Sequence, residues 1–149
     1  AAGSYIGYVS RRDPYPETLE ALKTIQGRCR TAILSNADDD YLLPNLKRLG
    51  LEFDVVLSSE QARAYKPHPG LFREVLRRLR VTPQESVYVG DRQGEDVQGA
   101  TEVGINAIWI NRSSAPPDAQ LPKPVCQISN LLQLPDILLA WPPAEDGAR

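Results

Sequence analysis

Four short apolar segments constrain most strongly what this chain can fold into. Each is rich in valine and isoleucine and lacks the alternation of apolar and polar residues that marks a strand with one wet face. Segments of this kind are typical of strands that are buried on both faces of a sheet. They are "TAILSN" (31–36), "DVVLSS" (54–59), "SVYVGD" (86–91) and "NAIWIN" (106–111).

Helical spacing separates these segments. Leu42, Leu46 and Leu49 recur on one helical face, and Gly50 follows them as a predicted C-terminal stop. Similar apolar stripes lie in residues 16–26, 72–79 and 97–103. Strands that alternate with helices predict βαβ units, so we expect an α/β fold with a doubly wound parallel sheet.

The two ends of the chain differ from this pattern. Residues 113–124 are rich in proline and serine and predict an exposed crossing. We expect "VCQIS" to add an edge strand, Ser129 to cap a last helix, and residues 141–149 to form a frayed tail. Residues 14–140 are then one core domain, and residues 4–9 fit either a strand or a helix.

Composition excludes several classes of partner. The net charge is −2, without the basic excess that nucleic-acid binding needs, and no apolar run approaches the roughly 20 residues of a spanning helix. The two cysteines lie far apart, which favours reduced thiols in a cytoplasmic protein. The chain has no methionine, so we expect that Ala1 is not where translation began.

Polar residues follow three of the predicted strands directly. Ser35 and Asn36 follow the first, Lys66 comes soon after the second, and Asp91 follows the third, with Glu95 and Asp96 close behind. In a parallel sheet these ends meet at one edge, which is where such sheets bind ligands. Carboxylates for Mg²⁺ together with ammonium, hydroxyl and amide donors suit a phosphate or carboxylate group.

Each of these residues also has a simpler interpretation. Asp91 could be a turn residue, Lys66 a solvated surface lysine, and Ser35-Asn36 an ordinary turn. His68, the only histidine, is expected to be a loop residue, and Asp38–Asp40 to supply capping charge. The occurrence of one such group after each strand favours a functional site.

Three stretches together resemble motifs of the haloacid dehalogenase-like hydrolase superfamily. They are "AILSNAD", "SSEQARAYKPHPGLF" and "VYVGDRQGEDVQGA", in the family's order and spacing. The resemblance runs from about Pro14 to Leu138, and "INAIWINR" and "ISNLLQLPDIL" are similar to the subfamily of small phosphatases and dehalogenases.

The resemblance assigns roles to single residues. Ser35 would bind the transferring phosphoryl group, helped by the backbone at Asn36, and Lys66 would stabilise charge on the nucleophile and phosphoryl oxygens. Asp91 would hold Mg²⁺, and Asp96 would support it through water or hydrogen bonds. Glu95 stands where the family usually has asparagine. The implied activity is Mg²⁺-dependent hydrolysis of a small phosphorylated substrate.

The family's first motif, in which a nucleophilic aspartate and an acid/base aspartate follow the central strand, has no counterpart here. By this resemblance residues 1–13 are the end of a cap helix, or a substitute strand, and the usual first strand and cap are lacking. We therefore predict that the chain alone is inactive. The alternatives are a catalytically incomplete scaffold or fragment and a metal-independent 2-haloacid dehalogenase.

The missing strand would lie between "TAILSN" and "SVYVGD" in family strand order. Three outcomes are possible for this place in the sheet. Residues 4–9 fill it as a strand, the two flanking strands pair directly, or a partner chain or a further segment completes the sheet. Neither the pattern nor the resemblance decides between them, although the resemblance favours a helix for 1–12. A homo-oligomer is one form that such a partner could take.

Overall fold

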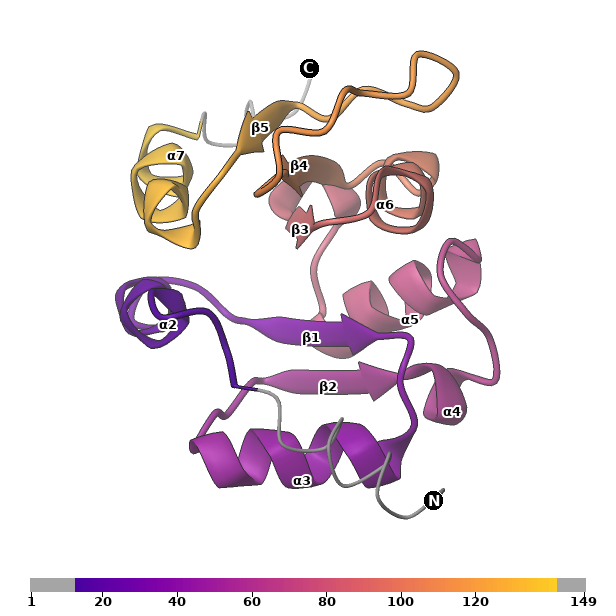
Figure 1. Ribbon diagram of the computed structural model, residues 1–149. Helices are drawn as coiled ribbons and strands as arrows, with labels where there is room; N and C mark the ends of the chain where they lie inside the picture. Colours follow the sequence, from indigo (N-terminus) through magenta and orange to yellow (C-terminus); the bar gives the residue numbers. More distant parts are fainter. Residues whose placement is uncertain (1–12, 142–149) are drawn as a thin grey trace, which may run out of the picture.

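The structure is a computed structural model that describes residues 13–141 (Figure 1). The strands are β1 (Ala32–Ser35), β2 (Val55–Ser58), β3 (Val87–Gly90), β4 (Asn106–Ile110) and β5 (Cys126–Ile128). The α-helices are α2 (Thr18–Gln26), α3 (Asp39–Leu49), α4 (Ser59–Ala62), α5 (Pro69–Leu79), α6 (Gln98–Glu102) and α7 (Leu134–Ala140). Single turns η1 (Pro83–Glu85), η2 (Gln93–Val97) and η3 (Leu131–Gln133) complete the described elements.

All five predicted strands form, and every pairing between them is parallel. β1 pairs with β2 so that Ser35 lies opposite Ser58, and β3 pairs with β4 so that Gly90 lies opposite Trp109. Helix α3 connects the first pair, and η2 with α6 connects the second, as βαβ units require. The predicted α/β fold with parallel strands is confirmed.

The described strands nevertheless form two sheets. One contains β1 and β2, and the other contains β3, β4 and β5 in that order. Within residues 13–141 no ladder of hydrogen bonds joins β1 to β3, so the expectation that these two strands pair directly is wrong. A cavity of about 790 Å³ lies between them and is lined by residues of both. The alternative that residues 4–9 fill this place falls outside the described residues.

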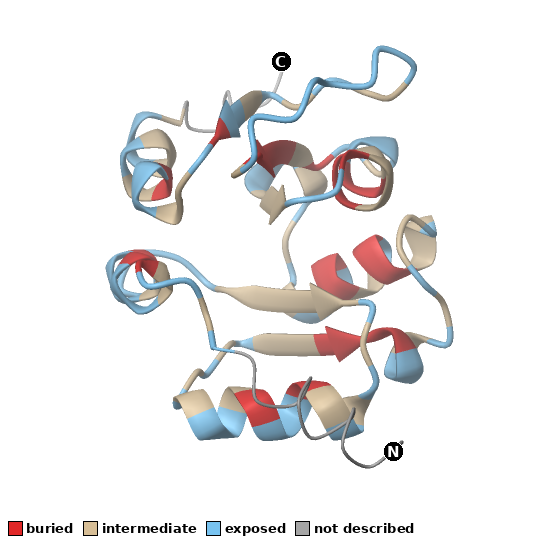
Figure 2. Cartoon of the chain, in the orientation of Figure 1, coloured by how far each residue is buried: buried red, intermediate tan, exposed pale blue. Residues whose placement is uncertain are grey.

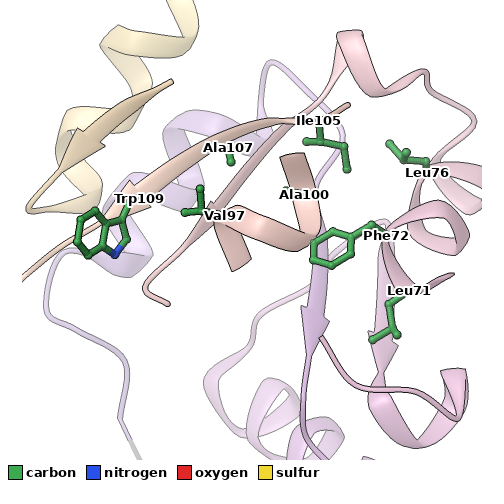
Figure 3. Close-up of a cluster of buried hydrophobic side chains, with 8 residues drawn as sticks. All are labelled: Leu71, Phe72, Leu76, Val97, Ala100, Ile105, Ala107 and Trp109. Carbon is green, nitrogen blue, oxygen red and sulfur yellow. The ribbon is translucent and has the colours of Figure 1, made fainter. Parts of the chain in front are cut away.

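Side chains of β3 and β4 alternate between two apolar clusters, which lie on opposite faces of their sheet. One cluster packs against α5, η2 and α6 (Figure 3), and the other packs against α2, η3 and α7. Figure 2 shows buried residues on α5, α6 and β4, around the first cluster. Tyr88, Ala107 and Trp109 point into the cluster beside α5 and α6. Val87, Val89, Ile108 and Ile110 point into the cluster beside α2 and α7. Burial on both faces explains why these segments lack polar alternation.

Helix ends follow the sequence signals in most places. Gly50 ends α3 with a left-handed backbone, at φ 65°, and its N–H donates to Leu46 O. His68 directly precedes α5 as its N-cap residue, where its Nδ1 accepts from the Gly70 N–H at 3.0 Å, so its predicted place in a loop is confirmed. The last helical segment departs from the prediction, because Asn130 rather than Ser129 caps η3 and accepts from the Leu132 N–H at 2.8 Å.

The connection from β4 to β5 is exposed over residues 113–120, as predicted. Among the helices of residues 13–141, none is both long enough and apolar enough to cross a bilayer. The predicted tail beyond residue 141, like the predicted cap-helix end before Asp13, lies outside the described residues.

Candidate active site

The carboxyl ends of β1, β2 and β3 carry the polar residues that the sequence singled out. Ser35 is the last residue of β1, and its hydroxyl makes no hydrogen bond to any other described residue. Asn36 follows it, Ser58 ends β2, and Gly90 ends β3 just before Asp91. Direct contacts between Asn36, Lys66 and Glu95 show that these strand ends come together.

Asn36 holds the loop that carries Lys66. Its Oδ1 accepts from the Lys66 N–H at 2.7 Å, and its Nδ2 donates to the Lys66 carbonyl oxygen at 3.4 Å. The same Nδ2 donates to Glu95 Oε2 at 3.4 Å. The Asn36 side chain therefore positions Lys66 and links it to the segment after β3, a role that the sequence did not indicate.

Lys66 and Asp96 form a nearly buried ion pair. The distance from Lys66 Nζ to Asp96 Oδ1 is 2.6 Å, and the two side chains are 12% and 4% exposed. Asp96 Oδ2 accepts from the Arg92 N–H at 3.0 Å. A Cβ at Gly90 would overlap the Asp96 side chain, so glycine is needed there for this close approach. Both Asp96 oxygens are engaged inside the protein, which favours the supporting form of its predicted role over direct metal coordination.

Tyr88 completes this group and was missed by the sequence reasoning. Its hydroxyl donates to Asp96 Oδ1 at 3.0 Å, and Lys66 Nζ lies 3.2 Å from the same hydroxyl oxygen. Its ring packs edge-on against Phe72, with centroids 5.1 Å apart. The available signal was a single hydroxyl-bearing residue within an otherwise aliphatic strand.

Asp91 differs from Asp96 in its exposure and in its side-chain contacts, the two properties that decide whether a carboxylate can bind a metal ion. Its side chain is exposed, and its carboxylate makes no hydrogen bond or ion pair with another described residue. Its carbonyl oxygen accepts from Trp109 Nε1 at 3.0 Å, which fixes the backbone at the end of β3. Arg92 Nη1 lies 3.3 Å from Glu95 Oε1 and partly neutralises the Glu95 carboxylate. Asp91 thus differs from Glu95 and Asp96 in having no side-chain partner among residues 13–141.

The acidic run after β1 has a structural use. Asp38 precedes α3 as its N-cap residue, but its side chain makes no capping bond. Asp39 Oδ1 instead accepts from Ser58 Oγ at 2.6 Å and from Gln61 Nε2 at 2.9 Å. These bonds tie the end of β2 to α3. Across residues 13–141 no three histidine, cysteine or acidic side chains converge as metal ligands.

Tyr88 gives the site a pH dependence that can be measured. Burial, and next the Asp96 carboxylate, raise the pKa of Tyr88 well above its ordinary value of 10.0. A group whose folded pKa is raised stabilises the fold below its unfolded pKa and loses that contribution as the pH rises. We expect the free energy of unfolding to fall above pH 10.0 by up to about 1.4 kcal/mol per pH unit more than in Tyr88→Phe.

Urea denaturation at several alkaline pH values measures this difference. Tyr65→Phe is the matched control, because Tyr65 is 66% exposed and its removal should leave the slope unchanged. Equal slopes for the wild-type chain and Tyr88→Phe would contradict the prediction.

Comparison with known proteins supplies the family. The sequence model described as haloacid dehalogenase-like hydrolase matches residues 8–110. The chain belongs to the haloacid dehalogenase-like hydrolase family. The predicted family resemblance is thereby confirmed.

Relatives of two activities lie within this family. The chain is 37% identical over 114 residues to a phosphoserine phosphatase of Thermus thermophilus, covering 74% of this chain and 46% of the relative. It is 32% identical over 131 residues to the (S)-2-haloacid dehalogenase 4A of Burkholderia cepacia, covering 86% and 54%. The crystal structure of a phosphatase of this family from Thermococcus onnurineus superposes with a TM-score of 0.76 at 35% identity, covering 83% and 57%. The chain thus spans about half the length of these relatives.

Proposed function

We propose that the carboxyl edge of this chain serves Mg²⁺-dependent hydrolysis of a small phosphorylated substrate. The observation that carries the proposal is Asp91, an exposed carboxylate without a partner among the described residues, directly after the last residue of β3. Mg²⁺ in phosphate-handling sites is commonly bound by one or two carboxylates together with waters and substrate oxygens. Asp91 fits the protein's share of such a site.

The charges around Asp91 support a cation. Lys66 is already balanced by Asp96, and Arg92 by Glu95, so Asp91 leaves this group of side chains with an excess negative charge. A phosphate group would be repelled by that charge unless a divalent cation lay between them. Bound there, Mg²⁺ would neutralise phosphoryl oxygens. Of the three acidic residues that follow β3, Glu95 and Asp96 are paired and Asp91 has no partner among the described residues, so we expect weak binding by the chain alone.

The other residues have roles that suit a phosphoryl group. The Ser35 hydroxyl, which has no other described partner, and the backbone N–H groups at Asn36 are donors for phosphoryl oxygens. Asn36 holds the backbone of Lys66, and Asp96 holds its ammonium group. The ammonium group is therefore already in position to stabilise negative charge on the phosphoryl oxygens. Asp96 and Tyr88 position Lys66, and Asp96 supports the metal site indirectly.

Two alternatives remain from the sequence. A metal-independent 2-haloacid dehalogenase is supported by the relative from Burkholderia cepacia, whereas the free Asp91 counts against it, because a haloacid is also an anion. A catalytically incomplete scaffold or fragment is supported by the divided sheet and by the absence of three convergent ligands within residues 13–141. A cytoplasmic location stays a prediction.

Calorimetric titration of the chain with MgCl₂ tests the proposal. We expect a millimolar dissociation constant that tightens when inorganic phosphate is present, since Asp91 and the phosphate then both coordinate the ion. Asp91→Asn should weaken binding by about tenfold or more, because it removes the charge of the carboxylate that is expected to hold the ion. Asp136→Asn, an exposed acid on α7, is the matched control and should change nothing. Equal affinity in wild type and Asp91→Asn would reject Asp91 as the ligand.

A further inference from the structure

Gln93 is a buried carboxamide at the start of η2. The residue is 9% exposed, and its side chain reaches the connection between β4 and β5. Its Oε1 accepts from the Asp118 N–H at 3.0 Å. Its Nε2 donates to the Asp118 carbonyl oxygen at 3.1 Å and to the Pro122 carbonyl oxygen at 3.4 Å. Both ends of the carboxamide are therefore used on the backbone of one distant segment.

Polar bonds, rather than apolar packing, hold that segment against η2. Neither of the two apolar clusters of the described chain includes a residue from 113–122. The segment turns at Asp118, whose carbonyl oxygen accepts from the Leu121 N–H at 3.2 Å. A Cβ at Gly94 would lie 3.7 Å from Leu121 Cδ1, so the Leu121 side chain lies against η2 beside the Gln93 bonds. The Gln93 carboxamide is thus the main polar link between η2 and this turn.

The place of the Asp91 carboxylate depends on the backbone around it. The carboxylate itself has no partner among the described residues, so no side-chain bond of its own holds it. Before it, the Trp109 indole donates to the Asp91 carbonyl oxygen at 3.0 Å. After it, the Arg92 N–H donates to Asp96 Oδ2 at 3.0 Å. Gln93 is the next residue, and its side chain ties the chain to a segment outside this loop.

We propose that Gln93 is a positioning residue for the metal site, because it fixes the chain two residues after Asp91 to the turn at Asp118. The inference rests on the proposed function, since it takes Asp91 as the ligand of Mg²⁺. Mg²⁺ demands near-ideal octahedral geometry, so a displaced carboxylate binds it less well. Loss of a group bonded to a metal ligand typically costs about 10–100-fold in affinity. Gln93 acts through the backbone instead, so we expect a smaller loss of about fivefold.

Asn111 provides a matched comparison in the same connection. It is 4% exposed, its Nδ2 donates to the Ala115 carbonyl oxygen at 2.8 Å, and its Oδ1 accepts from the Ala115 N–H at 3.0 Å. It is therefore also a buried carboxamide that is used on the backbone of this connection. Its side-chain bonds in the described structure stay within the connection and do not reach η2. If Gln93 were only structural, its loss would have the same effect as the loss of Asn111, which is lower stability at unchanged Mg²⁺ affinity.

Calorimetric titration of the full chain with MgCl₂ in the presence of inorganic phosphate tests the proposal. Gln93→Met keeps the length of the side chain but removes its amide, and it should weaken Mg²⁺ binding by about fivefold. Asn111→Leu should leave the affinity unchanged, and urea denaturation should show that both variants are folded and less stable than the wild type. Without Mg²⁺, the Arg92 and Asp96 amides should exchange hydrogen about fivefold faster in Gln93→Met alone, because both bond within this loop.

Leu121→Ala disturbs the same junction from the other side, and it should weaken Mg²⁺ binding by about twofold. If Gln93→Met does not fold, this variant decides: a weaker affinity supports the inference, and an unchanged affinity overturns it. Wild-type binding with equal affinity in Gln93→Met, or an equal loss in Asn111→Leu, would overturn the role of Gln93 and leave the proposed function standing. No Mg²⁺ binding by the wild-type chain would overturn both.

Discussion

No phenolate above the blank is expected when the 149-residue chain is incubated with Mg²⁺ and an aryl phosphate. By the family resemblance the reaction needs an attacking carboxylate, and water does not replace it at a comparable rate. Loss of the nucleophile in a well-studied hydrolase costs about 10⁶ in turnover. Among the described residues Asp96 is held by Lys66, and Asp39 by Ser58 and Gln61, so neither is available to attack.

An extended chain and a variant of it are the controls for this absence of activity. A chain extended at its amino end by an apolar strand that finishes in the family's paired aspartates should gain Mg²⁺-dependent turnover, and Asp91→Ala in that chain should abolish it. Robust turnover by the 149-residue chain would contradict the prediction. Asp13, which lies beside Arg48 at the other edge of the sheet, should be irrelevant in both cases, so Asp13→Asn serves as the control.

The second large effect concerns the Lys66–Asp96 pair. Asp96→Asn should lower the free energy of unfolding by about 3–5 kcal/mol, because it leaves a lysine charge buried without its counter-charge. The small exposure of both side chains makes this a buried pair rather than a surface one. Urea denaturation, with the midpoint and slope fitted together, measures the loss.

A surface pair is the natural comparison. Glu74 contacts Arg77 and Arg78 on α5, where Arg77 is 71% exposed, so Glu74→Gln should destabilise the fold far less than Asp96→Asn does. Replacing both members of the buried pair, as Lys66→Met with Asp96→Leu, should recover a large part of the loss, because no unpaired charge remains. A loss below about 1 kcal/mol for Asp96→Asn would show that water reaches Lys66 and would refute the prediction.

The strands were predictable because both of their faces are buried. The unbroken apolar runs inside "TAILSN" and "NAIWIN" favour strands that pack on both faces. Gly50 marks a helix end because its backbone adopts a left-handed conformation without strain. Pairing was not predictable in the same way. Whether β1 meets β3 depends on what else competes for their edges, and the residues of the two strands do not decide it; only the family resemblance indicated that a further strand belongs between them.

The site was predictable in its members but not in their contacts. The spacing brought Asn36, Lys66 and Asp96 to one edge, since parallel strands end together. It could not reveal that Asn36 would hold the Lys66 backbone or that Lys66 would pair with Asp96, because each of those bonds joins residues 30 positions apart along the chain. Tyr88 was missed because a tyrosine in an apolar strand is more often only a packing residue.

The alternation of side chains along β3 limits which insertions and deletions this strand can accept. Tyr88 faces the cluster beside Lys66 and Asp96, while its neighbours Val87 and Val89 face the cluster of α2 and α7. Deletion or insertion of a single codon within this strand would shift its register by one residue and turn every later side chain to the opposite face. The phenol would then meet aliphatic helices and a valine would meet the ion pair. Within β3 the fold therefore tolerates insertions or deletions only of two residues at a time. Substitutions that keep the length of the strand disturb the fold far less.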